Sequence, residues 1–191
     1  MAHIPDMKLK DLLLERKPKL LKRWFDRIIE SYPRDSSDFL KKQKNPFANP
    51  VGHTFSEGIN GLLDGLIEGS DPKGFDPFLN DIIRIKAVQD FSPSQAVSFL
   101  FLLKDVVRDS LEKEIREDSV MKELVELESR IDRLALLSFD IYMKCRERIY
   151  EIKADEVKRL TFRLLQRANL ICEIQETDRE SEIVLTKKIK G

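Results

Sequence analysis

The chain has 191 residues, of which 41% are hydrophobic and 36% charged, and its 34 basic residues balance its 34 acidic residues. This balance excludes a global field that would favour nucleic acid or an anionic membrane surface. No apolar run approaches the ~20 residues of a membrane span, and Met1–Lys10 is too polar for a signal peptide. We therefore expect a soluble, cytoplasmic protein without membrane insertion.

Residues that break helices are concentrated in the first half of the chain. Fourteen of the fifteen Pro and Gly residues lie at or before Pro93, and Ser94–Lys190 contains neither. Because both residue types destabilise helix interiors, this distribution predicts a turn-rich head followed by long uninterrupted helices. No strand pattern is longer than a few residues, so the predicted fold class is all-α.

Apolar residues recur at helical spacing in the N-terminal part. Leu9–Leu14 predicts a short helix closed by Pro18, and Leu20–Ile29 predicts a second helix. A third short helix is expected over Ser36–Lys44. Trp24, the only tryptophan, lies on the apolar stripe and is interpreted as a core residue.

A longer helix is predicted to begin at Pro50, with Asn49 as its cap, and to run to about Glu68. It contains three glycines: Gly58, Gly61 and Gly65. Each costs ~1 kcal/mol in a helix interior, so each needs a compensating reason. Close approach of another helix and a ligand lying on the backbone would both supply one, and we favour helix packing.

Two further helices are expected before the last one. After a loop over Gly69–Gly74, Asp76-Pro77 is interpreted as a cap followed by the first helical residue. Ser92 and Gln95 have the spacing of a capping box around Pro93, and that helix fades near Glu117.

The longest helical pattern opens at Ser119. Its apolar residues step by 4, 3, 4 and 3, as in a coiled coil, and they form the predicted dimer seam: Val120, Leu124, Leu127, Ile131 and Leu134. Beyond Ile152 the register shifts to Val157, Leu160 and Leu164, continued by Ile171 and Ile174. The helix is expected either to bend near Lys153–Glu156 or to project and pair with another chain. Thr177–Gly191 is expected to be loosely ordered.

Charge is segregated along the chain. Lys8–Lys44 holds twelve basic and six acidic residues, whereas Asp105–Glu128 holds nine acidic and four basic residues. Such blocks favour packing between segments or between subunits, and they are also what ordinary solvated helix faces carry.

Chemistry-bearing residues are sparse. The two histidines, His3 and His53, are far apart, and no spacing suggests a metal site or a nucleophile–base pair. Cys145 and Cys172 are interpreted as reduced, partly buried thiols. We therefore expect no enzyme activity, catalytic residue, metal or cofactor.

Several separated motifs resemble the RsbRD N-terminal domain family, the sensory half of RsbR-type stressosome proteins of bacteria, which are co-antagonists that hold the kinase RsbT. The motifs are Arg23-Trp24-Phe25, Ser31-Tyr32-Pro33, Phe47–Gly52 and Ile85–Ala96. The resemblance covers roughly Leu9–Tyr150. It implies a globin-like fold that carries no haem and a homodimer formed through the final helices.

The residues agree with a haem-free protein, since Pro77–Asp90, where globins place the proximal ligand, has no His, Met or Cys. No STAS-like pattern follows, so stressosome assembly and phosphorylation by RsbT are not carried over. The expected organisation is a globin-like sensory domain over residues 1–152 and a helical extension with a loosely ordered tail over residues 153–191.

Two functions remain open from the sequence. The first is a non-catalytic signalling module in the stress response, a homodimer that senses a signal or docks a regulatory protein partner of the kinase or antagonist type and binds no nucleic acid. The second is a carrier of a small apolar, lipid-like ligand in the place of haem. Its pocket would be lined by aromatic residues that otherwise simply fill the core: Trp24, Phe47, Phe55, Phe99 and Phe101.

Overall fold

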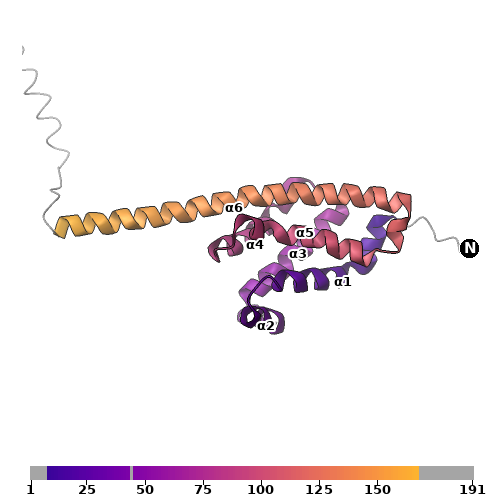
Figure 1. The fold of residues 1–191 in the computed structure, drawn as a ribbon, viewed down its shortest axis with the longest axis horizontal. Coiled ribbons are helices and arrows are strands. Elements are labelled where there is room, and N and C mark those ends of the chain that lie inside the picture. The colour runs from indigo at the N-terminus through magenta and orange to yellow at the C-terminus, as the bar shows by residue number, and fades with distance from the viewer. Residues whose placement is uncertain (1–7, 44, 168–191) are drawn as a thin grey trace, which may run out of the picture. The chain divides into compact units, whose positions relative to one another are not determined.

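The computed structural model describes residues 8–43 and 45–167, and over these residues it contains six α-helices, two 3-10 helices and no strand (Figure 1). The helices are α1 (Leu9–Ile29), α2 (Arg34–Lys42), α3 (Pro50–Glu68), η1 (Pro72–Phe75), α4 (Asp76–Val88), α5 (Pro93–Ser110), η2 (Glu114–Arg116) and α6 (Asp118–Arg167). The all-α prediction is confirmed. The chain divides into two compact units, Met1–Arg148 and Ile149–Gly191. None of the described helices is long and apolar enough to cross a membrane.

The first helix continues through Pro18, so the prediction of two helices separated there was wrong. A proline inside a helix costs ~3 kcal/mol because it removes one hydrogen bond and crowds the preceding turn. Pro18 is exposed, whereas Leu12, Leu13 and Leu20 on either side of it are buried. Burying each leucine contributes ~1.5–3 kcal/mol. Tertiary packing therefore outweighs the local penalty.

Two predicted caps are confirmed. Asn49 Oδ1 accepts a hydrogen bond from the Gly52 N–H at 2.8 Å, and Asn49 Nδ2 donates to the Leu40 carbonyl at 3.0 Å. This buried side chain therefore joins the end of α2 to the start of α3. Ser92 and Gln95 form the complete capping box of α5.

The predicted cap at Asp76 was wrong. Asp76 is the first residue of α4, and the chain enters this helix directly from η1, which occupies part of the expected loop. Asp71 caps η1 instead, accepting from the Lys73 N–H at 3.0 Å. The extra helical turn places Phe75, which is 4% exposed, against α3.

The three glycines of α3 allow α4 and η1 to pack closely against it. A β-carbon at Gly58 would lie 2.7 Å from Ile82 Cδ1, and one at Gly65 would lie 2.6 Å from Phe75 Cε1. A β-carbon at Gly61 would collide with the ring of Phe78. These distances are below van der Waals contact, so the helix-packing interpretation of the glycines is confirmed.

The core of the first unit contains Trp24, as predicted. Its side chain is fully buried, its ring stacks on Phe99 with centroids 6.2 Å apart, and its Nε1–H donates to the Phe99 carbonyl at 2.7 Å. The indole thus fills the space between α1 and α5 and satisfies its polar atom there.

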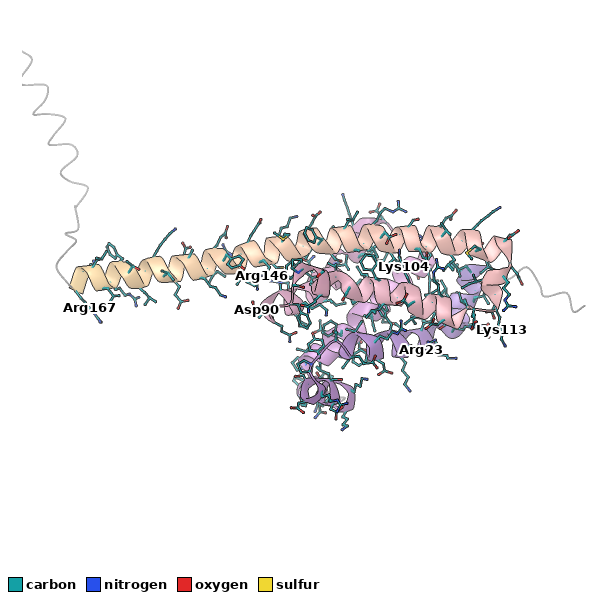
Figure 2. All side chains as sticks on the ribbon, in the orientation of Figure 1. Arg23, Asp90, Lys104, Lys113, Arg146 and Arg167 are labelled. Carbon is teal, nitrogen blue, oxygen red and sulfur yellow. The ribbon has the colours of Figure 1, made fainter. Side chains whose placement is uncertain are left out.

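The segregated charges meet between α1 and the end of α5. Arg23, labelled in Figure 2, pairs with Asp109 at 3.0 Å, and Arg27 pairs with Asp105 at 3.3 Å. Arg16 also pairs with Glu114. The basic and acidic blocks therefore contact each other within one chain. Such partly exposed ion pairs contribute only ~0.2–1 kcal/mol each to the free energy of unfolding. Their arrangement favours packing of α1 beside the end of α5, but they add little to the stability of the fold.

The last helix, α6, is uninterrupted through Lys153–Glu156, so the helix does not break there. The residues expected to continue its second seam, Ile171 and Ile174, lie outside the described residues, as do Cys172 and the tail Thr177–Gly191.

Candidate functional site

The predicted dimer seam lies inside the first unit. Its five residues, Val120, Leu124, Leu127, Ile131 and Leu134, are between 0% and 3% exposed. Their 4-3 spacing places them on the face of α6 that packs on the chain's own core. They are therefore not available as a surface for a second copy. A coiled-coil spacing describes any helix with one narrow apolar stripe, whichever partner covers it.

A different face of α6 exposes large apolar side chains. Leu136, Phe139 and Met143 recur at helical spacing and are 70%, 44% and 38% exposed. Helix α5 lies alongside α6 (Figure 1), and the ion pairs Lys104–Asp132 and Arg108–Glu128 join the two helices in antiparallel register. This register places Phe101, which is 44% exposed, level with Leu136. We call Phe101, Leu136, Phe139 and Met143 the α5–α6 apolar face. Exposed apolar groups gathered in this way mark interaction sites.

The second unit has an exposed stripe of its own. Val157, Leu160 and Leu164, the second seam predicted from the sequence, are 62%, 51% and 64% exposed. Their spacing of three and four residues puts them on one side of the helix.

The five aromatic residues expected to line a ligand pocket are not brought together. Trp24, Phe55 and Phe99 are at most 1% exposed in the core. Phe47 is 97% exposed in the loop before α3, and Phe101 lies on the α5–α6 apolar face.

A buried lysine forms a site that sequence reasoning missed. Lys86 of α4 is 1% exposed, and its Nζ lies 4.4 Å from the ring centroid of Phe91, 5.4 Å from that of Tyr32 and 5.5 Å from that of Phe55. We call these four residues the Lys86 cage. Within the described part of the chain, Nζ has no carboxylate or hydrogen-bond partner. The sequence signal was available: Lys86 stands three and four residues after Ile83 and Ile82, on the core face of its helix.

Burial shifts both titrating groups of the cage. Desolvation of the ammonium lowers the pKa of Lys86 to about 8, and desolvation of the phenolate raises the pKa of Tyr32 to about 12. Both shifts favour the neutral form. The three rings attract the ammonium through cation–π contacts, which offset part of its lost hydration.

An open groove lies beside the cage. Its volume is about 440 Å³, and Tyr32 belongs to both, lining the groove and forming part of the cage. Phe39, Leu40 and Val51 supply apolar wall, and the Tyr32 hydroxyl donates to Gln89 Oε1 at 2.9 Å across the groove's edge. Asp35 lies at the rim and is exposed.

The chain segment after Lys86 contacts α6. The Tyr142 hydroxyl donates to the Phe91 carbonyl, and Arg146 Nη1 donates to the Ala87 carbonyl at 3.0 Å and to Asp90 Oδ1 at 2.6 Å. Figure 2 labels Asp90 and Arg146 at this corner. Asp90 has a φ of +58°, a left-handed conformation that is unusual outside glycine. The corner between α4 and α5 is thus held against α6 by hydrogen bonds from Tyr142 and Arg146.

A second pocket, of about 400 Å³, lies where α3, η1 and α6 meet within the first unit. Leu66, Phe75 and Leu134 form its apolar lining, and Arg130 and Arg133 border it. Arg130 Nη1 donates to the Leu66 carbonyl at the end of α3 at 3.1 Å.

The remaining residues with potential chemistry lie apart. His53 is exposed on α3, and the half-buried Cys145 thiol has its pKa raised by desolvation, which makes it a poor nucleophile. Among residues 8–43 and 45–167, no three His, Cys, Asp or Glu side chains gather as metal ligands would.

Comparison with known proteins gives one family. The model of the RsbT co-antagonist protein rsbRD N-terminal domain matches residues 18–157. A protein of Archaeoglobus fulgidus described only as uncharacterized is 24% identical in an alignment of 149 positions that covers 75% of this chain and 85% of that protein. No solved structure gives a significant match.

Proposed function

We propose a regulatory function for this chain on the premise that it belongs to the RsbRD N-terminal domain family, a family of sensory domains of the RsbT co-antagonist type. The chain would act as a non-catalytic homodimeric sensor that passes a signal to a regulatory protein. The observation that carries this proposal is the α5–α6 apolar face.

The dimer part of the proposal rests on exposure. Phe101, Leu136, Phe139 and Met143 are each at least 38% exposed and come from two neighbouring antiparallel helices. A two-fold symmetric interface brings the same patch of both copies together, so one apolar stripe along a helix is enough to build it. Covering these side chains would remove apolar surface from water at ~25 cal/mol per Å².

The globin-like arrangement without haem is the finer part of the proposal. The family implies it, and α4, the helix expected to carry an axial ligand, contains no His, Met or Cys. The rings of Trp24 and Phe99 stack on each other inside the core, so their stacked faces are not available to a haem group.

We assign contact with a regulatory partner to the stripe Val157, Leu160 and Leu164 of the second unit. These side chains are exposed and regularly spaced, as is typical of a helix that pairs with another helix. An RsbT-type kinase is the partner to test first, because the family is named for its relation to RsbT.

Light scattering tests the dimer. The chain is expected to have the mass of a dimer at micromolar concentration, and Phe139→Glu is expected to give a monomer because it places a charge in the apolar interface. Phe47→Glu is the matched control, since Phe47 is 97% exposed and belongs to the loop before α3, not to α5 or α6. A wild-type monomer at tens of micromolar, or a Phe139→Glu dimer as tight as wild type, would contradict the proposed arrangement.

A further inference from the structure

We propose that the Lys86 cage and the groove beside it form a binding site for a small monocarboxylate with an apolar tail, of the medium-chain fatty acid class. The inference deepens the proposed function, because it supplies the signal that the sensor would detect.

The charge of the site selects an anion. Lys86 is 1% exposed and no carboxylate among the described residues pairs with its Nζ. A buried ammonium without a counter-ion gains most from a ligand that brings a negative charge. An external cation is excluded, because Lys86 already occupies the space between the rings of Tyr32, Phe55 and Phe91 and would repel it.

The donors at the cage fit a carboxylate. The Tyr32 hydroxyl now donates to Gln89 Oε1 at 2.9 Å, and this exposed bond is exchangeable with water. A carboxylate that replaces Gln89 as the acceptor would receive one hydrogen bond from the Tyr32 hydroxyl, which lines the groove. The Lys86 ammonium does not line the groove but lies 5.4 Å from the centroid of the same ring, so it would attract the carboxylate through its charge.

The groove fits the tail. Its volume of about 440 Å³ lies in the range of small-molecule sites, ~300–1,000 Å³. Phe39, Leu40 and Val51 line it with apolar groups. Asp35, the one acidic residue on its wall, is exposed at the rim, where water screens its charge from the head group.

The location suits a signal input. Phe91 of the cage accepts a hydrogen bond from Tyr142 of α6, and the residue after Lys86, Ala87, accepts one from Arg146. A change in the position of Tyr32 or Lys86 therefore reaches α6 through direct contacts of the α4–α5 corner. All these residues lie in the first unit.

Calorimetric titration with octanoate tests the site on the full chain. We expect octanoate to bind, and octan-1-ol, which has the same tail without the charge, to bind at least about tenfold more weakly. Lys86→Met is expected to weaken octanoate binding by at least about tenfold and to leave octanol binding unchanged. This variant removes a buried charge and keeps the apolar stem, so loss of folding is not the expected cause.

Arg133→Gln is the matched control, because it removes a positive charge from the other apolar pocket. It should bind octanoate as wild type does. Equal affinity of wild type and Lys86→Met for octanoate, equal affinity of wild type for octanoate and octanol, or no binding at millimolar octanoate would overturn the proposal. A weakened Arg133→Gln with an unchanged Lys86→Met would place the ligand in the other pocket and also overturn it.

Hydrogen exchange and light scattering on the same samples complete the test. Octanoate should slow amide exchange of α6 around Tyr142 and Arg146 in wild type and not in Lys86→Met. A dimer that binds no octanoate overturns this site and leaves the proposed dimer intact. A monomer that binds octanoate supports this site and overturns the proposed dimer.

Discussion

At the scale of the single residue, Lys86 is the most unusual feature of the described chain. Its helix places it on the core face, and its Nζ is held among three aromatic rings and not by a carboxylate. Burial lowers the pKa of Lys86 from 10.5 to about 8. This shift means that the fold disfavours the charged amine relative to the neutral amine by ~3 kcal/mol. A residue that lowers stability in this way is a candidate for function.

The pH dependence of stability should report this lysine. Below pH 8 the folded and unfolded chains both carry the protonated amine, so the folded state bears the full penalty. Between pH 8 and about 10 the unfolded chain binds more protons, so the free energy of unfolding rises with pH. Tyr32, with its pKa raised to about 12, acts in the opposite direction only above pH 10, where the unfolded phenol ionises first. Chemical denaturation at pH 7 and pH 10 measures the effect.

The variant Lys86→Met isolates the contribution of this lysine to the pH dependence of stability. We expect this variant to be more stable than wild type at pH 7, by about 1–3 kcal/mol, and the difference to shrink by pH 10. Lys104→Met, which removes a lysine paired with Asp132, controls for the general effect of losing one positive charge. A difference between wild type and Lys86→Met that is the same at both pH values would refute the assignment.

At the scale of the helix, the glycines of α3 show how a local cost is offset by packing. Ala is a better helix former than Gly by ~1 kcal/mol, so a glycine-to-alanine change on an exposed helix face would stabilise the chain. At Gly58 the new β-carbon would lie 2.7 Å from Ile82 Cδ1, and Ile82 is fully buried and has little freedom to move. Steric overlap should therefore outweigh propensity at this position.

Gly58→Ala is expected to destabilise the chain by about 1–3 kcal/mol, the range of overpacked cores. Gly61→Ala should cost less, because the half-buried Phe78 ring that it would meet can turn toward water. Gly74→Ala, whose nearest neighbour would be Ser70 Cβ at 3.8 Å, serves as the control. Thermal melts of the three variants give the order, and a Gly58→Ala variant as stable as Gly74→Ala would argue against tight α3–α4 packing.

At the scale of the whole molecule, two apolar surfaces serve different proposed roles. The α5–α6 apolar face belongs to the first unit and the stripe Val157, Leu160 and Leu164 to the second. If the two roles are separate, substitutions in one surface should leave the role of the other surface unchanged. Leu160 is 51% exposed, so its replacement should not disturb the core.

Leu160→Glu is therefore expected to keep the dimer mass and the melting temperature of wild type and to abolish binding to an RsbT-type kinase, measured by calorimetry. Leu136→Glu is expected to dissociate the dimer. A Leu160→Glu variant that binds the kinase as wild type does would remove the stripe from the proposed interface.

Much of the fold could be predicted from the sequence because its signals are local. The Asn49 and Ser92 caps depend on atoms within three residues, and the absence of Pro and Gly over Ser94–Lys190 is enough to indicate long helices. Apolar spacing likewise identified Trp24 as a core residue. The family also followed from short motifs, confirmed by the match over residues 18–157.

Tertiary structure decided the rest, because it depends on which face meets which neighbour. Spacing marked Val120–Leu134 as an apolar seam, and only packing showed that the chain itself covers it, while Leu136 and Phe139 stay exposed. Because proline destabilises a helix interior, the sequence predicted a helix end at Pro18. Only the burial of the leucines around it keeps α1 continuous. The Lys86 cage joins residues 32, 55, 86 and 91, which are far apart in sequence except for the last two. Periodicity assigns a residue to a face, but the environment of that face is a property of the whole fold.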